Sequence, residues 1–341
     1  MWEKLEGANR VLMEVDLKPV QGDRFQPTGF ADLGAAMYER PDGKRMLLVE
    51  SAQSMANRLE HTCLQGNGPH IAPMLKGLPY VVAQLTGGST AETSSLVEAH
   101  RINSPYIISD AHFQKAFSKM AGYEKGKVLD WGAVAKTLLH YDPNSLIHGV
   151  FMANLGDGRV KVPRILTGFI EAEGVREAPS GGVKNNPLDP SGKLRAVAEP
   201  KNVYGNVPYH RTEYTASRIT ASFNLDFAAM QGYQLPAEGM DLLVGLSLYK
   251  VRRFVQGSMR LRTACDLVPK GEIRVTGPPD FSLPTTEKLL ETVQKSIQAC
   301  TEKGLFAKPA VTIIKCETKV KKEGENEADN GEGVSEQSEE Q

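Results

Sequence analysis

A short segment near residue 50 combines the side-chain types that hold nucleic-acid backbones. The pattern predicts a helix over 51–60 that begins at Ser51, a residue that caps a first turn well, with its apolar residues on one narrow arc. The opposite arc carries amide, hydroxyl and guanidinium groups: Gln53, Ser54, Asn57 and Arg58. Such a face suits sugar hydroxyls and phosphate oxygens, because a helix N-terminus also presents unpaired N–H groups. A capped helix whose polar residues bond nearby loops explains the same pattern, so both interpretations stay open.

A basic run without an intervening acid lies between residues 250 and 262. Its cations are Lys250, Arg252, Arg253, Arg260 and Arg262. If the chain after Gly257 is extended, Arg260 and Arg262 share the face opposite the core. Two aligned arginines near Ser258 and a glycine suit phosphate binding. A surface strand whose arginines pair with acids elsewhere is the alternative.

The loop over residues 21–34 is a third candidate binding segment. Arg24, Gln26 and Thr28 supply a cation, an amide and a hydroxyl beside two phenylalanines, a mixture that proteins use to hold bases and backbone. A rigid connector whose phenylalanines fill the core fits equally well. A later polar arm invites the same interpretation with less support, through Tyr204, Tyr209, His210 and Arg211.

Motifs for catalysis and metal binding are missing from the sequence. It contains no G-x-S-x-G, H-E-x-x-H or Walker loop, and no Rossmann fingerprint after a strand. The four cysteines are far apart and predict free thiols rather than a zinc site or a disulfide framework: Cys63, Cys265, Cys300 and Cys316. We therefore expect a protein that is not an enzyme and that holds no metal or cofactor.

The composition is that of a cytoplasmic globular protein with an acidic end. The chain has 341 residues, 40% apolar and 24% charged, which predicts one elaborate domain or two ordinary ones. No apolar run approaches the ~20 residues of a membrane-spanning helix, and the first residues lack the features of a secretory signal. Residues 323–341 hold eight acids and no Lys or Arg, so the remainder has 40 basic against 33 acidic residues. We expect this tail to be disordered, while the basic body permits nucleic-acid binding.

Helical and strand patterns alternate along the body and predict an α+β fold. Helices are expected at 51–60, 111–120, 131–140, 240–256 and 286–303, and strands at 11–17, 45–49, 146–153, 164–171, 214–227, 258–267, 272–276 and 311–315. Two of these strands, 146–153 and 164–171, are expected to pair with each other. Residues 61–110 are expected to be an irregular insertion. The polar stretch from 174 to 208 is either a functional arm or disorder.

Four segments in order resemble backbone subunits of the CRISPR Cascade complex. Residues 47–60 are similar to the strand and helix of these subunits, whose S-x-Q-S-x-x-x-R pattern is met by Ser51, Gln53, Ser54 and Arg58. FQPTGFADLGAA at 25–36, HGVF at 148–151 and QGSMRLRTACDL at 256–267 resemble the type I-G (formerly I-U) branch of the RAMP superfamily. The likeness spans roughly residues 8 to 316.

The resemblance implies a fold, an assembly and partners. The fold would be an RRM-like (ferredoxin-like) palm over 1–316 with insertions at about 61–110 and 172–212, the second a thumb-like arm, followed by the acidic tail at 317–341. Copies would polymerise along crRNA in a surveillance complex that recognises target DNA, together with a large subunit and a repeat-processing subunit. Type III relatives cut RNA with an aspartate in a backbone loop. Asp23 and Asp32 lie in the corresponding loop, but type I members do not cleave.

The residues and the resemblance lead to one predicted site and two alternatives. The predicted RNA-binding residues are Arg24, Gln26, Thr28, Ser51, Gln53, Ser54, Asn57, Arg58, Arg252, Arg253, Ser258, Arg260 and Arg262. They would contact backbone rather than bases, as a guide of variable sequence requires. The first alternative is an RNA-processing endonuclease of the same superfamily with His61 or His148 as general base. The second is a metabolic enzyme with a basic pocket for a phosphate substrate.

Overall fold

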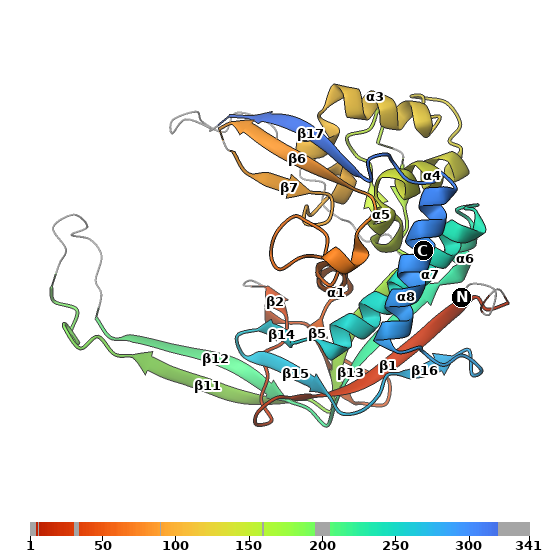
Figure 1. Cartoon of the computed structure of the whole chain (residues 1–341). Helices are drawn as coiled ribbons and strands as arrows, with labels where there is room; N and C mark the ends of the chain where they lie inside the picture. The colour runs from red at the N-terminus through yellow and green to blue at the C-terminus, as the bar shows by residue number, and fades with distance from the viewer. Residues whose placement is uncertain are drawn as a thin grey trace.

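A curved antiparallel sheet forms the base of the molecule (Figure 1). The computed structural model describes residues 5, 7–30, 34–88, 90–158, 160–194 and 205–319. The sheet order is β14-β15-β1-β13-β10-β5-β4, and β16 also pairs with β1. The bounds are β1 Arg10–Pro19, β4 Met37–Glu39, β5 Arg45–Glu50, β10 Leu166–Glu173, β13 Arg218–Asp226, β14 Met259–Arg262, β15 Cys265–Pro269 and β16 Arg274–Gly277. The expected α+β class is confirmed.

One face of this sheet is apolar because its strands alternate in and out of the core. Cross-strand rows such as Val15, Ala221 and Ile170 are buried, each residue opposite the next in the register. Helices α1 (Ala52–His61) and α7 (Ala237–Gln256) cover this face, and α8 (Thr286–Glu302) lies along α7. Helix α6 (Phe227–Gln231) follows β13 directly.

The opposite face of the central sheet is mostly polar, with Leu12 and Phe169 also exposed on it. It carries four carboxylates: Glu14, Asp16, Glu171 and Glu173. Arg218 and Arg274 pair with Asp16 at 2.8 Å and 3.2 Å. The hydrogen bonds from these two arginines, that of Arg274 first, lower the pKa of the Asp16 carboxyl. The cations of this face that lie beside Asp16 are therefore occupied by ion pairs.

A two-stranded hairpin projects from the sheet. Strands β11 (Arg176–Lys184) and β12 (Val207–Thr215) pair with each other from Arg176↔Thr215 to Lys184↔Val207 and extend far from the body (Figure 1). The stretch 174–208, for which the sequence allowed either a functional arm or disorder, thus contains regular strands. Residues 216–217 interrupt the strand, so the single strand expected at 214–227 is divided between β12 and β13. Tyr204 lies outside the described residues.

A smaller sheet forms a second layer with several helices. Strand β17 (Val311–Thr318) is parallel to β6 (Tyr80–Gly87), which pairs with β7 (Glu92–Ser94). The expectation of an irregular segment at 61–110 is wrong over β6, whose Val81 and Ala83 are fully buried. Strand β17 ends at Thr318, two residues beyond the predicted end of the domain at 316. The residues from 320 onward are outside the described part. Around this sheet lie α2 Pro105–Ile108, α3 Ala111–Met120, α4 Trp131–Tyr141, η2 Pro73–Leu75 and η3 Arg101–Asn103.

The predicted pairing of 146–153 with 164–171 is wrong. Residues Pro143–His148 form the helix α5, because Asp142 caps it and Pro143 occupies its first turn. The following β8 (Val150–Phe151) pairs with β9 (Lys161–Val162), and β10 pairs instead with β13 and β5. Two further short strands, β2 (Gly29–Phe30) and β3 (Gly34–Ala35), form a small ribbon. In the described ranges, no helix is both long and apolar enough to cross a bilayer.

Candidate nucleic-acid interface

Glu50 is the centre of a buried ionic cluster at the end of β5. Its side chain is 0% exposed. The Arg58 Nε donates to Glu50 Oε1 at 2.5 Å, and the Ser54 hydroxyl donates to the same oxygen. The Arg262 Nη2 donates to the other oxygen, Oε2. Two guanidinium groups therefore share one carboxylate, and this Glu50 cluster carries a net charge of about +1.

Backbone carbonyls hold the same two arginines from behind. The Arg58 Nη2 donates to the carbonyl of Leu261 at 2.7 Å, and the Arg262 Nη1 donates to the carbonyl of Gln26 at 3.0 Å. The cluster thus joins helix α1, strand β14 and the loop after β1, which are far apart in the sequence. The side chains of Arg58 and Arg262 keep 27% and 23% exposure, so each retains surface for a ligand.

Arg58 lines a cleft of about 650 Å³ between α1 and the end of α7, which we call the helix cleft. Ser54 and Asn57 lie in it from α1, and Arg253 and Ser258 from the other side. Helix α1 begins as the sequence predicted, with the Ser51 hydroxyl accepting from the Ser54 amide at 3.3 Å. The described lining contains arginines and neutral hydrogen-bonding groups and no Asp or Glu.

Arg262 lines a second cleft of about 510 Å³ at the base of the hairpin, which we call the hairpin cleft. Gln26 and Thr28 line it from the first loop, and Arg211 and Tyr214 from β12. Reciprocal backbone hydrogen bonds of 2.9 Å between Phe25 and Tyr214 fix the loop to the hairpin. No acid belongs to the described lining of this cleft either.

A second buried glutamate supports the hairpin cleft. Glu213 accepts from Arg211 Nη2 at 2.6 Å and lies 3.8 Å from Arg24 Nε. Arg24 itself is largely exposed. This glutamate again holds two cations, one from the loop and one from the hairpin.

The structure brings most of the predicted binding residues to these two clefts. Those that line a cleft are Gln26, Thr28, Ser54, Asn57, Arg58, Arg253, Ser258 and Arg262. Ser51 caps α1, Gln53 and Arg260 are exposed outside the linings, and Arg24 lies beside Glu213. Arg252 is not brought to either cleft. Its guanidinium donates to the carbonyls of Leu283 and Pro284 at 2.9 Å and 3.0 Å and pairs with Glu272 at 3.1 Å, so it holds the segment before α8.

The sequence did not identify the two glutamates or assign Arg211 to the site. Glu50 ends the strand RMLLVE after four apolar residues and directly before the helix cap. A lone acid at such a position needs a buried cation, and the basic run from 250 to 262 is the source of one. This signal was present in the sequence, although it does not name the partner.

Lys250 and His148 belong to the core and not to the site. The Lys250 Nζ lies 2.5 Å from Asn144 Oδ1 and 2.7 Å from His148 Nε2, and both side chains are buried. Burial lowers the pKa of both groups. A general base must reach a substrate, so the proposal of His148 as a general base is wrong. His61 is exposed and lines the helix cleft.

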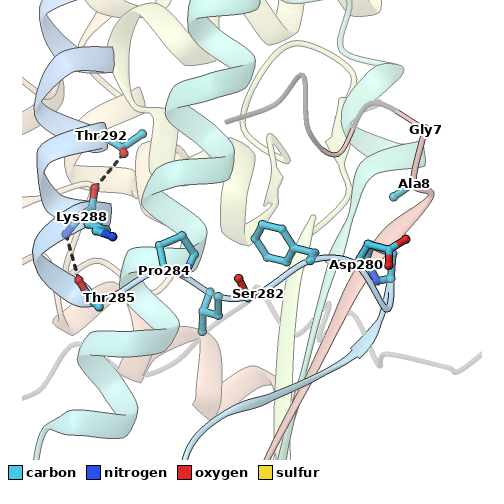
Figure 2. A pocket seen from close by; sticks show the side chains of 11 residues that line it. Gly7, Ala8, Asp280, Ser282, Pro284, Thr285, Lys288 and Thr292 are labelled. Carbon is cyan, nitrogen blue, oxygen red and sulfur yellow. Dashed lines mark hydrogen bonds between the residues drawn. The ribbon is translucent and has the colours of Figure 1, made fainter.

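A cavity of about 890 Å³ lies on another side of the molecule, between residues 7–8 and the start of α8 (Figure 2). Its threonines make hydrogen bonds at the start of α8. The Lys288 amide donates to Thr285 Oγ1 at 3.4 Å, and Thr292 Oγ1 donates to the Lys288 carbonyl at 2.8 Å. Lys288 and Asp280 are its charged lining residues, and no predicted binding residue lies there. We assign it no ligand.

Metal ligands are not grouped within the part of the chain that the structure describes. No set of three or more His, Cys, Asp or Glu side chains there could hold an ion. All four cysteines are free, and three of them are buried. The chemistry of the clefts is therefore that of guanidinium, amide and hydroxyl groups.

Comparison with known proteins connects this chain to CRISPR systems. Residues 11–177 match the model of a family described as CRISPR-associated protein GSU0053 (Cas_GSU0053), which confirms the resemblance to CRISPR-associated proteins. No curated protein matches the chain significantly.

Two solved structures align with this chain at low similarity. One is described as "CRISPR RNA-guided surveillance complex, pre-nicking", with 12% identity, a TM-score of 0.40, and coverage of 86% of this chain and 89% of that chain. The other is the crystal structure of Thermofilum pendens Csc2, with 10% identity, a TM-score of 0.30, and coverage of 86% and 76%. At these scores the two structures add no argument about fold or function.

Proposed function

We propose that this chain, whose residues 11–177 carry the CRISPR-associated match, is a guide-RNA-binding backbone subunit of a type I-G surveillance complex. Copies polymerise along crRNA and support recognition of target DNA, together with a large subunit and a repeat-processing subunit. The subunit is a scaffold and not an enzyme.

One observation carries the RNA-binding role. Two clefts without acids in their described linings flank the Glu50 cluster, and Arg58 and Arg262 each line one of them. Arginines and small neutral donors are the groups that contact phosphate and ribose in protein complexes with nucleic acids. Such contacts carry no base identity, which suits a guide whose sequence varies.

The proposed palm is RRM-like, and the strand order supports this. The segments follow the sequence β1, α1, β10, β13, α7, β15, and the corresponding strands lie in the order β15-β1-β13-β10, all antiparallel. With β4, β5 and β14 set aside as additions to the same sheet, this order agrees with the β-α-β-β-α-β arrangement of ferredoxin-like domains and supports the proposal. The hairpin β11–β12 joins β10 to β13 and is the proposed thumb.

Replacing Arg253 tests the helix cleft. Its side chain is exposed and makes no hydrogen bond or ion pair within the described residues, so Arg253→Ala removes a cation without breaking a structural contact. We expect the affinity for single-stranded RNA at ~0.1 M salt to fall by roughly 3–10-fold, equally for two unrelated sequences, and the salt slope to fall by about 1.

Arg218→Ala is the matched control for this variant. It removes the same charge from the open sheet face, where Arg218 pairs with Asp16, and it should leave RNA binding unchanged. Fluorescence anisotropy across a salt titration measures both variants. An Arg253→Ala curve that overlays the wild type would contradict the assignment of the helix cleft.

Expression together with a guide tests the scaffold role. RNA of uniform length that co-purifies with a multi-subunit particle supports it, and a monomer free of RNA speaks against it. The endonuclease alternative is now restricted to His61, which lines the helix cleft with Arg58 and Arg253. Incubation of the protein with repeat RNA distinguishes the two, because only a nuclease produces defined fragments. A metabolic enzyme would bind no long RNA at all.

A further inference from the structure

Resting on the proposed RNA-binding function, we propose that Glu50 is a positioning residue that makes Arg58 and Arg262 into a two-sided phosphate clamp. One RNA strand would contact Arg58 in the helix cleft and Arg262 in the hairpin cleft at the same time. Glu50 itself would touch no RNA, because it is buried behind both guanidinium groups.

The hydrogen-bond pattern leaves each arginine with donors for a ligand. A guanidinium has five N–H donors. Arg58 uses its Nε and Nη2 groups on Glu50 and on the carbonyl of Leu261. Arg262 uses its two Nη groups on the carbonyl of Gln26 and on Glu50. The remaining donors belong to side chains that are still more than a fifth exposed and that line the clefts.

A shared carboxylate explains how two cations are held together without RNA. Two guanidinium groups on one small cluster repel each other, and the Glu50 charge offsets that repulsion while one net positive charge remains for a phosphate. Both arginines are thus oriented before the ligand arrives, which reduces the ordering that binding requires.

Another buried pair in the same molecule shows the contrast. Glu60 bonds one arginine, Arg101, through both oxygens at 2.6 Å and 2.9 Å, and Arg101 Nη1 donates to the carbonyl of Gly149 at 3.0 Å. The Arg101 side chain is only 12% exposed and belongs to neither cleft lining. One carboxylate with one enclosed arginine is a structural pair, whereas Glu50 serves two arginines that reach the surface.

The variant Glu50→Gln tests the clamp through the sign of its effect. The amide of glutamine accepts through one oxygen and presents a donor where the second guanidinium donates, so one arginine loses its position. Removing a negative charge near the clefts would by itself strengthen RNA binding. Loss of positioning instead weakens it. For a labelled mixed-sequence single-stranded RNA, we expect ~10-fold weaker binding and a salt slope lower by about 1.

A second variant and a matched control complete the experiment. Arg262→Lys keeps the charge, but an ammonium group does not span both Glu50 and the Gln26 carbonyl as a planar guanidinium does. We expect it to bind the same RNA roughly 3–10-fold more weakly, and it decides the matter if Glu50→Gln does not fold. Glu60→Gln is the control for disturbing a buried pair, and it should leave affinity and salt slope unchanged even where thermal stability falls.

The outcomes separate this inference from the function on which it rests. Unchanged or tighter binding by a folded Glu50→Gln protein, or unchanged binding by Arg262→Lys, overturns the clamp while RNA binding itself stands. A wild-type protein that binds no RNA overturns the proposed function instead.

Discussion

At the scale of single residues, the buried charges fall into two groups with different roles. Glu50 and Glu213 hold arginines that reach the two clefts. Lys250, His148 and Asp142 are fully enclosed among helices α5 and α7 and their neighbours. In the proposed function the first group serves RNA binding, whereas burial of the second group makes the stability of the fold depend on pH.

Asp142 gives this pH dependence a sign. Burial raises its pKa to about 6 from 3.8, so the folded state binds the proton more tightly than the unfolded state does. The contribution of protonated Asp142 to the unfolding free energy is complete below pH 4 and is lost as the pH rises through 6. Asn does not titrate and keeps the cap to the Asn144 amide. Compared with the wild type, Asp142→Asn should therefore gain about 1–3 kcal/mol in unfolding free energy between pH 4 and pH 7.

Urea unfolding at several pH values measures this difference. The exposed aspartate Asp266, changed to Asn, serves as the control for the same substitution at the surface. A gap between Asp142→Asn and wild type that does not widen with pH would show that Asp142 is not buried as a costly charge.

At the scale of elements, one glycine sets how closely helix α1 lies on the sheet. A Cβ atom at Gly168 would lie 2.7 Å from the ring of Phe223 and 3.1 Å from Met55 Cγ. Met55 is one of the buried residues of α1 and lies next to Gly168 of β10. The absent side chain therefore sets the height of the helix, and with it the position of Arg58 in the Glu50 cluster.

Gly168→Ala should destabilise the fold by about 1–3 kcal/mol, because a methyl group there overpacks a filled core. Gly245→Ala is the matched control: it also adds a buried methyl, but with contacts of 3.4 Å or more, and it lies in the helix α7. It should be neutral or stabilising by up to about 1 kcal/mol. Denaturant midpoints of the two variants measure this contrast, and equal midpoints would refute the packing argument.

The sequence predicted elements well where the signal is local. The helix after Ser51 was found from its cap and its periodicity, and the helices α3, α4, α7 and α8 likewise. The pairing of 146–153 failed because a short apolar run does not distinguish strand from helix. The arginines Arg58, Arg253 and Arg262 of the two clefts were predicted from their own types, whereas Arg211 was not assigned to the site. Glu50, the common partner of Arg58 and Arg262, was not predicted, since it is joined to Arg262 across 212 positions and no local pattern records that contact.

At the scale of the whole molecule, charge is unevenly distributed. The clefts are cationic, the open sheet face carries four carboxylates, and eight acids are concentrated in residues 323–341. Deleting residues 323–341 should raise the affinity for RNA at low salt, because the remaining chain has 40 basic against 33 acidic residues. The gain should vanish as salt screens it.

A variant of full length with these eight acids changed to Gln and Asn is the control for chain length. It should reproduce the effect of the deletion in the same anisotropy titration. Identical RNA affinity of wild type and both variants at low salt would show that the acidic segment does not compete with RNA.

The carboxylates on the open face of the sheet also make this face differ in charge from the surface that carries the two clefts. A polyanion that approaches from that side meets Glu14, Asp16, Glu171 and Glu173, and the neighbouring arginines are already paired. The cations Arg40, Lys44, Arg218 and Arg274 balance these carboxylates, so this face offers a phosphate no net positive charge, whereas the two clefts do. If copies line up along one strand as proposed, each would turn this charge-balanced surface away from the RNA.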